Sequence, residues 1–164
     1  MMKRTFTISL ALLAIAVCAC AQEQAQQGPN IEGVYILVSR QLPDGTTQQP
    51  PDIKGLLSYS NGYRNFNIIW KDSTGNKVSV SLASSYKLAT DEYSETNLFH
   101  VSTNEANNEI NYDVSGQTGS SPVTVTNGRI EFDFPLFDEP SIVFEGDNAT
   151  ATGPGFVDTW EKVK

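Results

Sequence analysis

Cysteine is almost absent from this sequence of 164 residues, and both cysteines, Cys18 and Cys20, lie close to the N-terminus. The rest of the chain therefore has no disulfide framework, no thiolate nucleophile and no cysteine metal site. Histidine is equally scarce, since His100 is the only one. That scarcity excludes metal sites built on two or more histidines and any catalytic scheme that needs two imidazoles.

Helical patterning is also missing after Ala21. No stretch of about a dozen residues keeps apolar side chains at i, i+3, i+4 and i+7, and Gly, Asn, Asp, Ser and Thr recur too often for helices. What recurs instead is alternation of apolar and polar residues between closely spaced turns. This pattern is typical of a meander of antiparallel strands.

Basic residues are few, with 11 Lys and Arg against 19 Asp and Glu. Removal of the N-terminal signal described next takes away Lys3 and Arg4, so nine basic residues would face 19 acidic ones, a net charge of −10. Such acidity argues against binding nucleic acid or anionic lipid surfaces, because both require a basic patch. Solubility accounts for the charge most simply, and positively charged partners are left open.

The N-terminus carries an export signal. Lys3 and Arg4 precede an uncharged run over residues 8–19, which is too short to cross a bilayer, where roughly 20 residues are needed. Ala19, Cys20 and Ala21 then form a small-residue cleavage site. We predict a signal peptide over residues 1–21, and a retained membrane anchor is the less favoured alternative.

A second processing route competes with simple cleavage. Residues 17–20, Val-Cys-Ala-Cys, are similar to a bacterial lipobox, in which the final cysteine, here Cys20, is lipidated. Residues 22–29 are a polar, Gln-rich linker of the kind that tethers a lipoprotein. The two routes predict either a periplasmic or secreted bacterial protein or one anchored to the outer membrane, with no membrane contact except through the lipid.

The remaining residues, 30–164, are enough for one domain with one core and too few for two. Residues 48–51, Gln-Gln-Pro-Pro, read as a loop, and Asn-Gly pairs at 61–62 and 127–128 predict tight hairpin turns. The predicted strands cover residues 31–41, 53–60, 63–71, 78–89, 93–103, 110–114, 123–125, 130–134, 142–145 and 156–163.

An open sheet of nine or ten strands would leave long edges exposed, so closure is expected. Short turns between consecutive strands favour an up-and-down barrel. The last strand is strongly amphipathic and can pair with the first. The predicted fold class is therefore all-β, an antiparallel up-and-down barrel of about eight to ten strands.

Four segments of the chain resemble small bacterial exported lipocalin-like domains. Residues 33–39 are similar to the opening G-x-W-x-L-x-S strand, and 54–59 to a K-G-x-L-x-Y element. Residues 85–88 with 93–96 resemble the G-x-Y…Y-x-E-x segment, and 158–163 the closing E-x-W-x-R-V strand. The chain departs from these patterns at Tyr35, Ser85, Asp158 and Lys162, where Trp, Gly, Glu and Arg are usual. The resemblance implies a barrel of about eight strands whose cavity binds one small ligand, and binding more than catalysis.

The strand over residues 93–103 carries the most informative polar side chain. Strict alternation places Glu95 on one face with Tyr93, Phe99 and Val101, which we expect to point into the barrel, and places His100 on the opposite, surface face. An inward carboxylate needs a partner or a proton. Glu95 could hold a polar ligand group or act as an acid or base. The favoured alternative is a buried structural hydrogen bond to a tyrosine or to Arg64.

Aromatic residues are the other candidates, because they either line a cavity or fill a solid core. Together with Glu95, the candidate ligand-binding residues are Tyr35, Tyr59, Phe66, Trp70, Tyr86, Tyr93, Phe99 and Trp160.

The leading hypothesis is an exported barrel that binds a small, largely apolar or amphipathic molecule without catalysis. No cofactor or metal is predicted, since the acidic loops with Asp-Glu at 138–139 and Asp-Asn at 147–148 lack the order of a calcium loop. Two alternatives stay open: a barrel enzyme of isomerase or cyclase type with a buried carboxylate, and a structural or interaction module with a filled core. The oligomeric state is left undetermined.

Overall fold

The computed structural model describes residues 28–164. The predicted signal peptide, the candidate lipidation site Cys20 and residues 22–27 of the predicted linker lie outside the described residues. From residue 28 to residue 164 every regular element is a strand, and none of these residues forms a helix long and apolar enough to cross a membrane.

Twelve strands make up this part of the chain. They are β1 (Gly33–Gln41), β2 (Thr47–Gln48), β3 (Ile53–Ser60), β4 (Tyr63–Lys71), β5 (Lys77–Leu88), β6 (Glu92–Asn104), β7 (Glu109–Asp113), β8 (Thr118–Thr126), β9 (Arg129–Asp133), β10 (Ser141–Glu145), β11 (Asn148–Gly153) and β12 (Phe156–Lys162).

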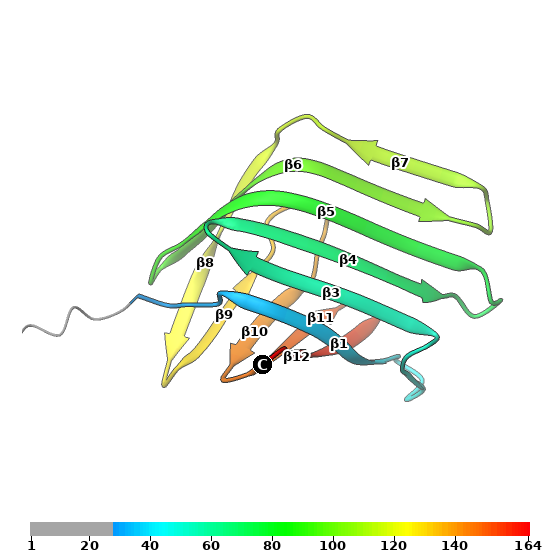
Figure 1. The fold of residues 1–164 in the computed structure, drawn as a ribbon, viewed down its shortest axis with the longest axis horizontal. Coiled ribbons are helices and arrows are strands. Elements are labelled where there is room, and N and C mark those ends of the chain that lie inside the picture. The colour runs from blue at the N-terminus through cyan, green and yellow to red at the C-terminus, as the bar shows by residue number, and fades with distance from the viewer. Residues whose placement is uncertain (1–27) are drawn as a thin grey trace, which may run out of the picture.

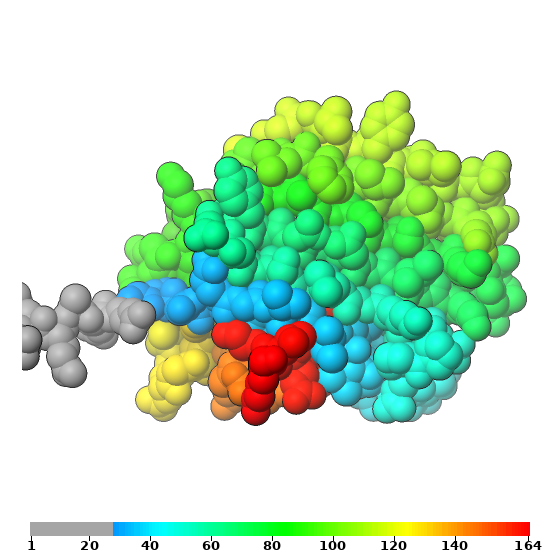
Figure 2. Space-filling view, viewed as in Figure 1, coloured from blue at the N-terminus to red at the C-terminus, as the bar shows by residue number. Residues whose placement is uncertain are grey.

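Ten of these strands form a closed antiparallel barrel (Figure 1). Around the ring the order is β12-β11-β10-β9-β8-β6-β5-β4-β3-β1, and β12 pairs with β1 to complete it. Figure 2 shows this seam, where the C-terminal residues in red lie against β1 in blue. The predicted all-β, up-and-down barrel and its closure by the last strand are confirmed. The ring has two strands more than the resemblance implies.

Two strands lie off the ring. β2 pairs only with the end of β1, within the connection that the proline-rich sequence predicted to be a loop. β7 pairs with the second half of β6, while β8 pairs with the first half, so β6 has different neighbours along its length. In the other direction β7 has no partner strand among the described residues, and its Ile110 and Tyr112 are exposed.

The tight hairpins follow from their turn residues. Asn61 and Gly62 join β3 to β4 with φ values of 51° and 77°, and Asn127 and Gly128 join β8 to β9 with 52° and 81°. Two consecutive positive φ values define the turn whose twist matches that of paired strands, and Asn-Gly adopts it most readily. These turns fix the register of both hairpins, including the unbroken pairing of β3 with β4.

Two β-bulges decide which side chains enter the barrel. One lies between Leu37 and Ser39 in β1, and the other between Asn97 and Phe99 in β6, where Leu98 has no counterpart on β5. A bulge adds one residue to one strand and so reverses the inside–outside alternation beyond it. In β1 the bulge brings Arg40 to the interior face that Tyr35 and Leu37 already occupy.

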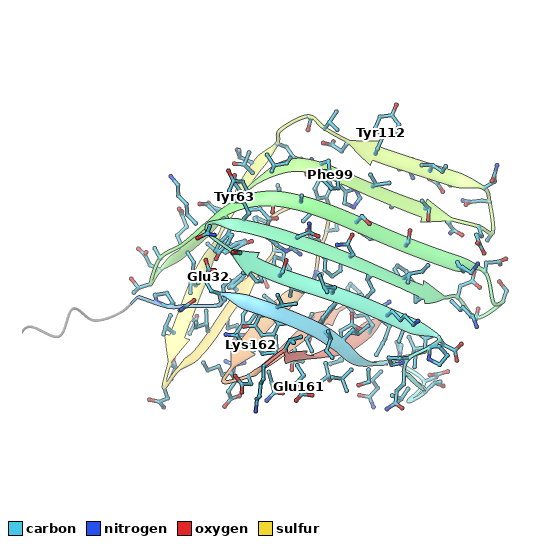
Figure 3. All side chains as sticks on the ribbon, in the orientation of Figure 1. Glu32, Tyr63, Phe99, Tyr112, Glu161 and Lys162 are labelled. Atoms are coloured by element: carbon cyan, nitrogen blue, oxygen red, sulfur yellow. The ribbon has the colours of Figure 1, made fainter. Side chains whose placement is uncertain are left out.

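The β6 bulge corrects the face assignments made from strict alternation. Phe99 (Figure 3) pairs with Ala83 on the outer wall and is 40% exposed. Val101, two residues further along the strand, shares that face. His100 instead pairs with Leu82, a fully buried residue, so it faces the barrel interior. The placement of Phe99 and Val101 inside, and of His100 on the surface, was therefore wrong. Tyr93 and Glu95 precede the bulge and do point inward.

The barrel interior is divided into a filled half and a hollow half. At the end of the barrel where β1 begins, aromatic rings pack edge-to-face or stacked, with centroid separations from 4.2 to 6.0 Å. These rings belong to Tyr35, Tyr59, Tyr86, Tyr93, Phe132 and Phe144. Ile31, just before β1, is buried with this cluster, and its carbonyl accepts a hydrogen bond from the Tyr35 hydroxyl at 3.1 Å. The hollow half contains the candidate site.

Candidate functional site

A cavity of about 410 Å³ occupies the hollow half of the barrel. It reaches the connections β1–β2, β4–β5, β9–β10 and β11–β12, which surround its mouth at the end of the barrel where β1 ends. Its apolar wall is formed by Leu57, Phe66, Ile68, Trp70, Val80, Phe134, Phe137, Ile142, Ala151, Phe156 and Trp160. The sequence left open whether the aromatic residues line a cavity or fill a solid core. The structure has both, a cavity in one half of the barrel and a solid core in the other.

The candidate ligand-binding residues separate accordingly. Phe66, Trp70 and Trp160 line the cavity. Tyr35, Tyr59, Tyr86 and Tyr93 belong to the aromatic cluster of the filled half and do not reach it. Phe99 is on the outer wall, and Glu95 lies in the ion cluster described next.

A buried ion cluster separates the two halves. Arg64 of β4 is only 1% exposed, and its Nη1 lies 3.0 Å from Oε1 of Glu95 and 3.2 Å from Oε1 of Glu139. Nη2 of Arg64 donates to the second oxygen of Glu139. The guanidinium carbon also lies 3.7 Å from the centroid of the Phe134 ring. One cation thus joins two carboxylates from different walls of the barrel.

Glu95 is fully engaged within the filled half. Besides Arg64, it accepts hydrogen bonds from the Tyr93 hydroxyl at 2.9 Å and from the Ser84 hydroxyl. This is the arrangement of the structural alternative for Glu95, a hydrogen bond to a tyrosine and to Arg64. Because its oxygens are occupied and the side chain does not line the cavity, Glu95 has no free group to offer a ligand there.

Glu139 is the carboxylate of this cluster that lines the cavity. Its side chain is 13% exposed, and burial raises the pKa of this carboxyl group above its ordinary value, although Arg64 counteracts the rise. Burial alone would lower the pKa of Arg64, but the Glu139 and Glu95 carboxylates and Tyr59 outweigh it and raise that pKa. Arg64 is therefore a permanent cation, and Glu139 takes up a proton more readily than an exposed glutamate does.

A second buried ion pair lies nearer the mouth. Arg40 of β1 donates from Nε and Nη2 to the two oxygens of Asp158 of β12, both at 2.7 Å. The guanidinium carbon lies 4.1 Å from the Phe156 ring centroid and 4.9 Å from that of Trp70. Burial raises the pKa of Asp158, and the bonds to Arg40 oppose that rise. The charges of Arg40 and Asp158 are thus paired at the cavity wall.

The connection between β9 and β10, residues 134–140, forms one side of the mouth. Phe137 and Asp138 both have positive φ, 58° and 51°, which is costly for residues other than glycine. The turn allows Glu139 to reach Arg64 and lets Phe137 stack on His100, with centroids 4.2 Å apart and planes 15° apart. Burial lowers the pKa of His100, so its imidazole is uncharged at neutral pH.

Three residues that line the cavity have a buried polar atom without a hydrogen-bond partner among the described residues. These atoms are the donors Nε of Arg64 and Nε1 of Trp160 and the acceptor Oε1 of Gln48, and each is shielded from the cavity space. Trp160 packs over Gly55 of β3, where a Cβ atom would come within 2.6 Å of its ring. Only glycine permits this approach, so Gly55 fixes the position of the indole.

Sequence reasoning missed most of the polar residues at this site. Asp158 entered only as a departure from a motif, Glu139 only as half of an acidic pair, and Arg40 not at all. Arg64 was named as a partner of Glu95 but not of the cavity. A pairing of the first strand with the last places residues 40 and 158 close together, and opposite charges at those positions are the one signal available.

No group of three or more potential metal-ligating side chains occurs among residues 28–164. No protein-family model matches the sequence, and neither a curated protein nor a solved structure matches the chain.

Proposed function

We propose that this protein binds one small, largely apolar molecule in the hollow half of its barrel. The observation that carries the proposal is the aromatic and aliphatic cavity of about 410 Å³, which is open at one end of an otherwise filled barrel. Ligand sites in proteins are concave and mostly apolar, typically about 300–1,000 Å³ in volume, with a few placed polar groups. The cavity fits this description.

The contrast between the two halves supports a binding role. A barrel of this size that served only as a structural module would gain stability from filling its whole interior, because empty apolar volume forfeits packing energy. The filled half shows that this chain can supply enough aromatic side chains to do so. The small side chain of Ala151 at the cavity wall instead leaves room.

Two measurements on protein purified from its own host test the proposal. Native mass spectrometry should detect a non-covalent adduct of a few hundred daltons that organic solvent removes. The emptied protein should then enhance the fluorescence of an apolar dye, and the extracted molecule should displace that dye. A bare chain mass together with no dye binding would refute the proposed function.

We also propose that the protein is exported, either free or anchored through Cys20, as the N-terminal sequence predicts. The intact mass of the full-length product made in a bacterium distinguishes the routes. Cleavage before Gln22 gives an unmodified chain, whereas lipidation gives an acylated chain that starts at Cys20. A Cys20→Ala variant loses the acyl mass only in the second case. Retention of residues 1–21 in all products would refute both.

A barrel enzyme is the second candidate function, favoured by Glu139. This carboxyl group faces the cavity and has a raised pKa, which suits an acid or base for an isomerase or cyclase. Lipid extracts of the host, incubated with protein, would reveal a product of unchanged mass but different retention. Glu139→Gln should abolish that product while leaving dye binding in place.

A further inference from the structure

Strand β7 is an open edge on the outside of the barrel. One side of it pairs with the second half of β6, and the other side has no partner strand among residues 28–164. Figure 1 shows it at the outer margin of the sheet. Ile110, Tyr112 and Val114 are 69%, 75% and 70% exposed, and Figure 3 shows Tyr112 projecting from this margin. Neither proline nor lysine, two residues that block the pairing of edge strands, occurs in β7.

The backbone of this edge is free to form hydrogen bonds. The N–H group of Glu105 donates to the carbonyl oxygen of Lys77 on β5. Because the direction of hydrogen bonding alternates along a strand, residues 103 and 101 also bond towards β5, whereas residues 104, 102 and 100 bond to residues 109, 111 and 113 of β7. The N–H and C=O groups of Ile110 and Tyr112 therefore point away from β6, towards the open edge.

A second copy of this chain fits that edge in an antiparallel register centred on Tyr112. Such a pair has two-fold symmetry, so every contact in it occurs twice. On the outer face, Tyr112 lies opposite Tyr112 of the second copy, and Ile110 lies opposite Val114. On the other face, Asn111 lies opposite Asp113. Three highly exposed apolar side chains thus meet one another, and an amide meets a carboxylate.

The Asp113 carboxylate has an oxygen available for this contact. Its Oδ1 accepts hydrogen bonds from Asn97 Nδ2 at 2.9 Å, from the Ser115 N–H at 2.9 Å and from the Ser115 hydroxyl at 2.7 Å. Its Oδ2 has no partner among the described residues. That oxygen can accept from the side-chain amide of Asn111 of the second copy.

The neighbouring registers are less favourable. A register centred on Asn111 places Glu109 opposite Asp113, and one centred on Asp113 places that residue opposite itself, and like charges directly opposite each other are destabilising. A register centred on Ile110 places Tyr112 opposite Asn108, whose φ of 52° takes it out of the strand. Charge and backbone conformation together favour the register centred on Tyr112.

We propose that this protein forms a symmetric dimer in which β7 pairs with β7 of a second copy and the two Tyr112 residues meet at the two-fold axis. β7 lies off the closed ring, so this pairing leaves the barrel closure intact. A pair of single edge strands buries less than the roughly 1,200 Å² of a standard interface, so we expect a weak dimer with a Kd of about 1–100 µM. The inference is independent of the proposed binding function.

Cysteine crosslinking in the producing cells tests the register, because the chain has no cysteine after Cys20. Tyr112→Cys places two thiols directly opposite each other, at the Cα separation of about 5.5 Å that suits a disulfide. Ile110→Cys is the matched control on the same face, since its counterpart in the second copy lies about 14 Å away. Co-expression of Ile110→Cys with Val114→Cys restores a direct pair.

On a non-reducing gel after mild oxidation, we expect at least about tenfold more disulfide-linked dimer from Tyr112→Cys, and from the co-expressed pair, than from Ile110→Cys alone. Equal crosslinking in Tyr112→Cys and Ile110→Cys would overturn the proposed register. A Tyr112→Cys adduct with an unrelated protein in place of the dimer would overturn the second copy as the occupant of this edge.

Sedimentation velocity of the purified protein, in detergent if the chain is acylated, tests the dimer itself. The parent should pass from monomer to dimer between about 1 and 500 µM. Tyr112→Pro removes an N–H that points away from β6, so it should stay monomeric while the barrel folds. Tyr112→Lys keeps the backbone donor but adds like charges at the axis, and it should raise the Kd at least about tenfold.

The matched control for these variants is Tyr63→Ala, which changes another exposed aromatic residue, 58% exposed, at a distance from β7. It should dimerise as the parent does. A parent that remains monomeric at about 500 µM would overturn the proposal. Dimerisation of Tyr112→Pro and Tyr112→Lys with the affinity of the parent would also overturn it.

Discussion

Arg40 and Asp158 face each other directly across the seam where β1 meets β12 and the barrel closes. Two hydrogen bonds of 2.7 Å join them, and both side chains are buried. The pair thus stabilises the junction of the first strand with the last, at the mouth end of the cavity. The two residues are 118 positions apart, so this contact exists only once the ring has closed.

Removing one partner of this pair should cost far more than removing both. Asp158→Leu leaves the Arg40 guanidinium buried without a counter-charge, and we expect a loss of about 3–5 kcal/mol in the free energy of unfolding. The double variant Arg40→Met/Asp158→Leu should be much closer to the parent, because no buried charge remains. Urea denaturation of Arg40→Met, Asp158→Leu and the double variant gives the three losses in the free energy of unfolding, from which the interaction energy of the pair follows. Additive losses would contradict the assignment of a coupled buried pair.

Arg64 should be the most sensitive charged residue in the domain. Arg64→Met leaves Glu95 and Glu139 buried side by side, and we expect a loss of at least about 3–5 kcal/mol. The matched control is Lys71→Met, which breaks the Lys71–Asp52 pair, whose side chains are 50% and 58% exposed. That change should alter the free energy of unfolding by no more than about 1 kcal/mol. Comparable losses in both variants would show that the buried cluster has no special role.

Two alanines of β11 distinguish the hollow half from the filled half. Ala149 and Ala151 share the inward face, but only Ala151 lines the cavity. Ala151→Leu should fill cavity volume, abolish binding of an apolar dye and leave stability nearly unchanged. Ala149→Leu must overpack the aromatic cluster and should cost about 1–3 kcal/mol. Thermal melts and dye titrations on both variants measure these effects. Loss of dye binding in Ala149→Leu but not in Ala151→Leu would place the cavity elsewhere.

Glu139 predicts a specific pH dependence of stability. Its pKa in the folded protein is raised above that of the unfolded chain, so the folded state holds the proton more tightly. Stability from this group is therefore present at low pH and is lost as pH rises from its ordinary value of 4.5 through the raised one. Glu139→Gln does not titrate. Its stability relative to the parent should therefore increase with pH over that window, as urea denaturation at several pH values would show. A constant difference would contradict a raised pKa.

The strands that sequence reasoning placed well are those with both alternation and clear turn residues. β3 and β4 follow their predicted ranges because Asn61-Gly62 fixes the turn and alternation is unbroken on both sides. β11 was missed because its residues, Asn-Ala-Thr-Ala-Thr-Gly, are small and only weakly favour a strand. Its pairing with β10 and β12 supplies what its own sequence lacks.

The cavity could not be derived from the same patterns. Alternation assigns faces only while a strand is regular, and nothing in the residues around Leu98 marks a bulge. His100 and Phe99 were therefore exchanged between inside and outside. Glu139 reaches Arg64 from a connection 75 residues away, across the barrel, and local periodicity carries no information about such a contact. The site thus depends on closure and loop conformation, which only the assembled ring defines.

The β6 bulge has a consequence at the level of the gene. Leu98 is an extra residue that the strand expels to the outside, so the residues on either side of it keep their orientation towards β5. An in-frame loss of that single codon would restore strict alternation and still leave both Glu95 and His100 inside. The same loss within β4, whose pairing with both neighbours is unbroken, would turn every following side chain to the opposite face. Single-codon deletions should therefore be tolerated at the bulge, whereas selection should remove them along β4.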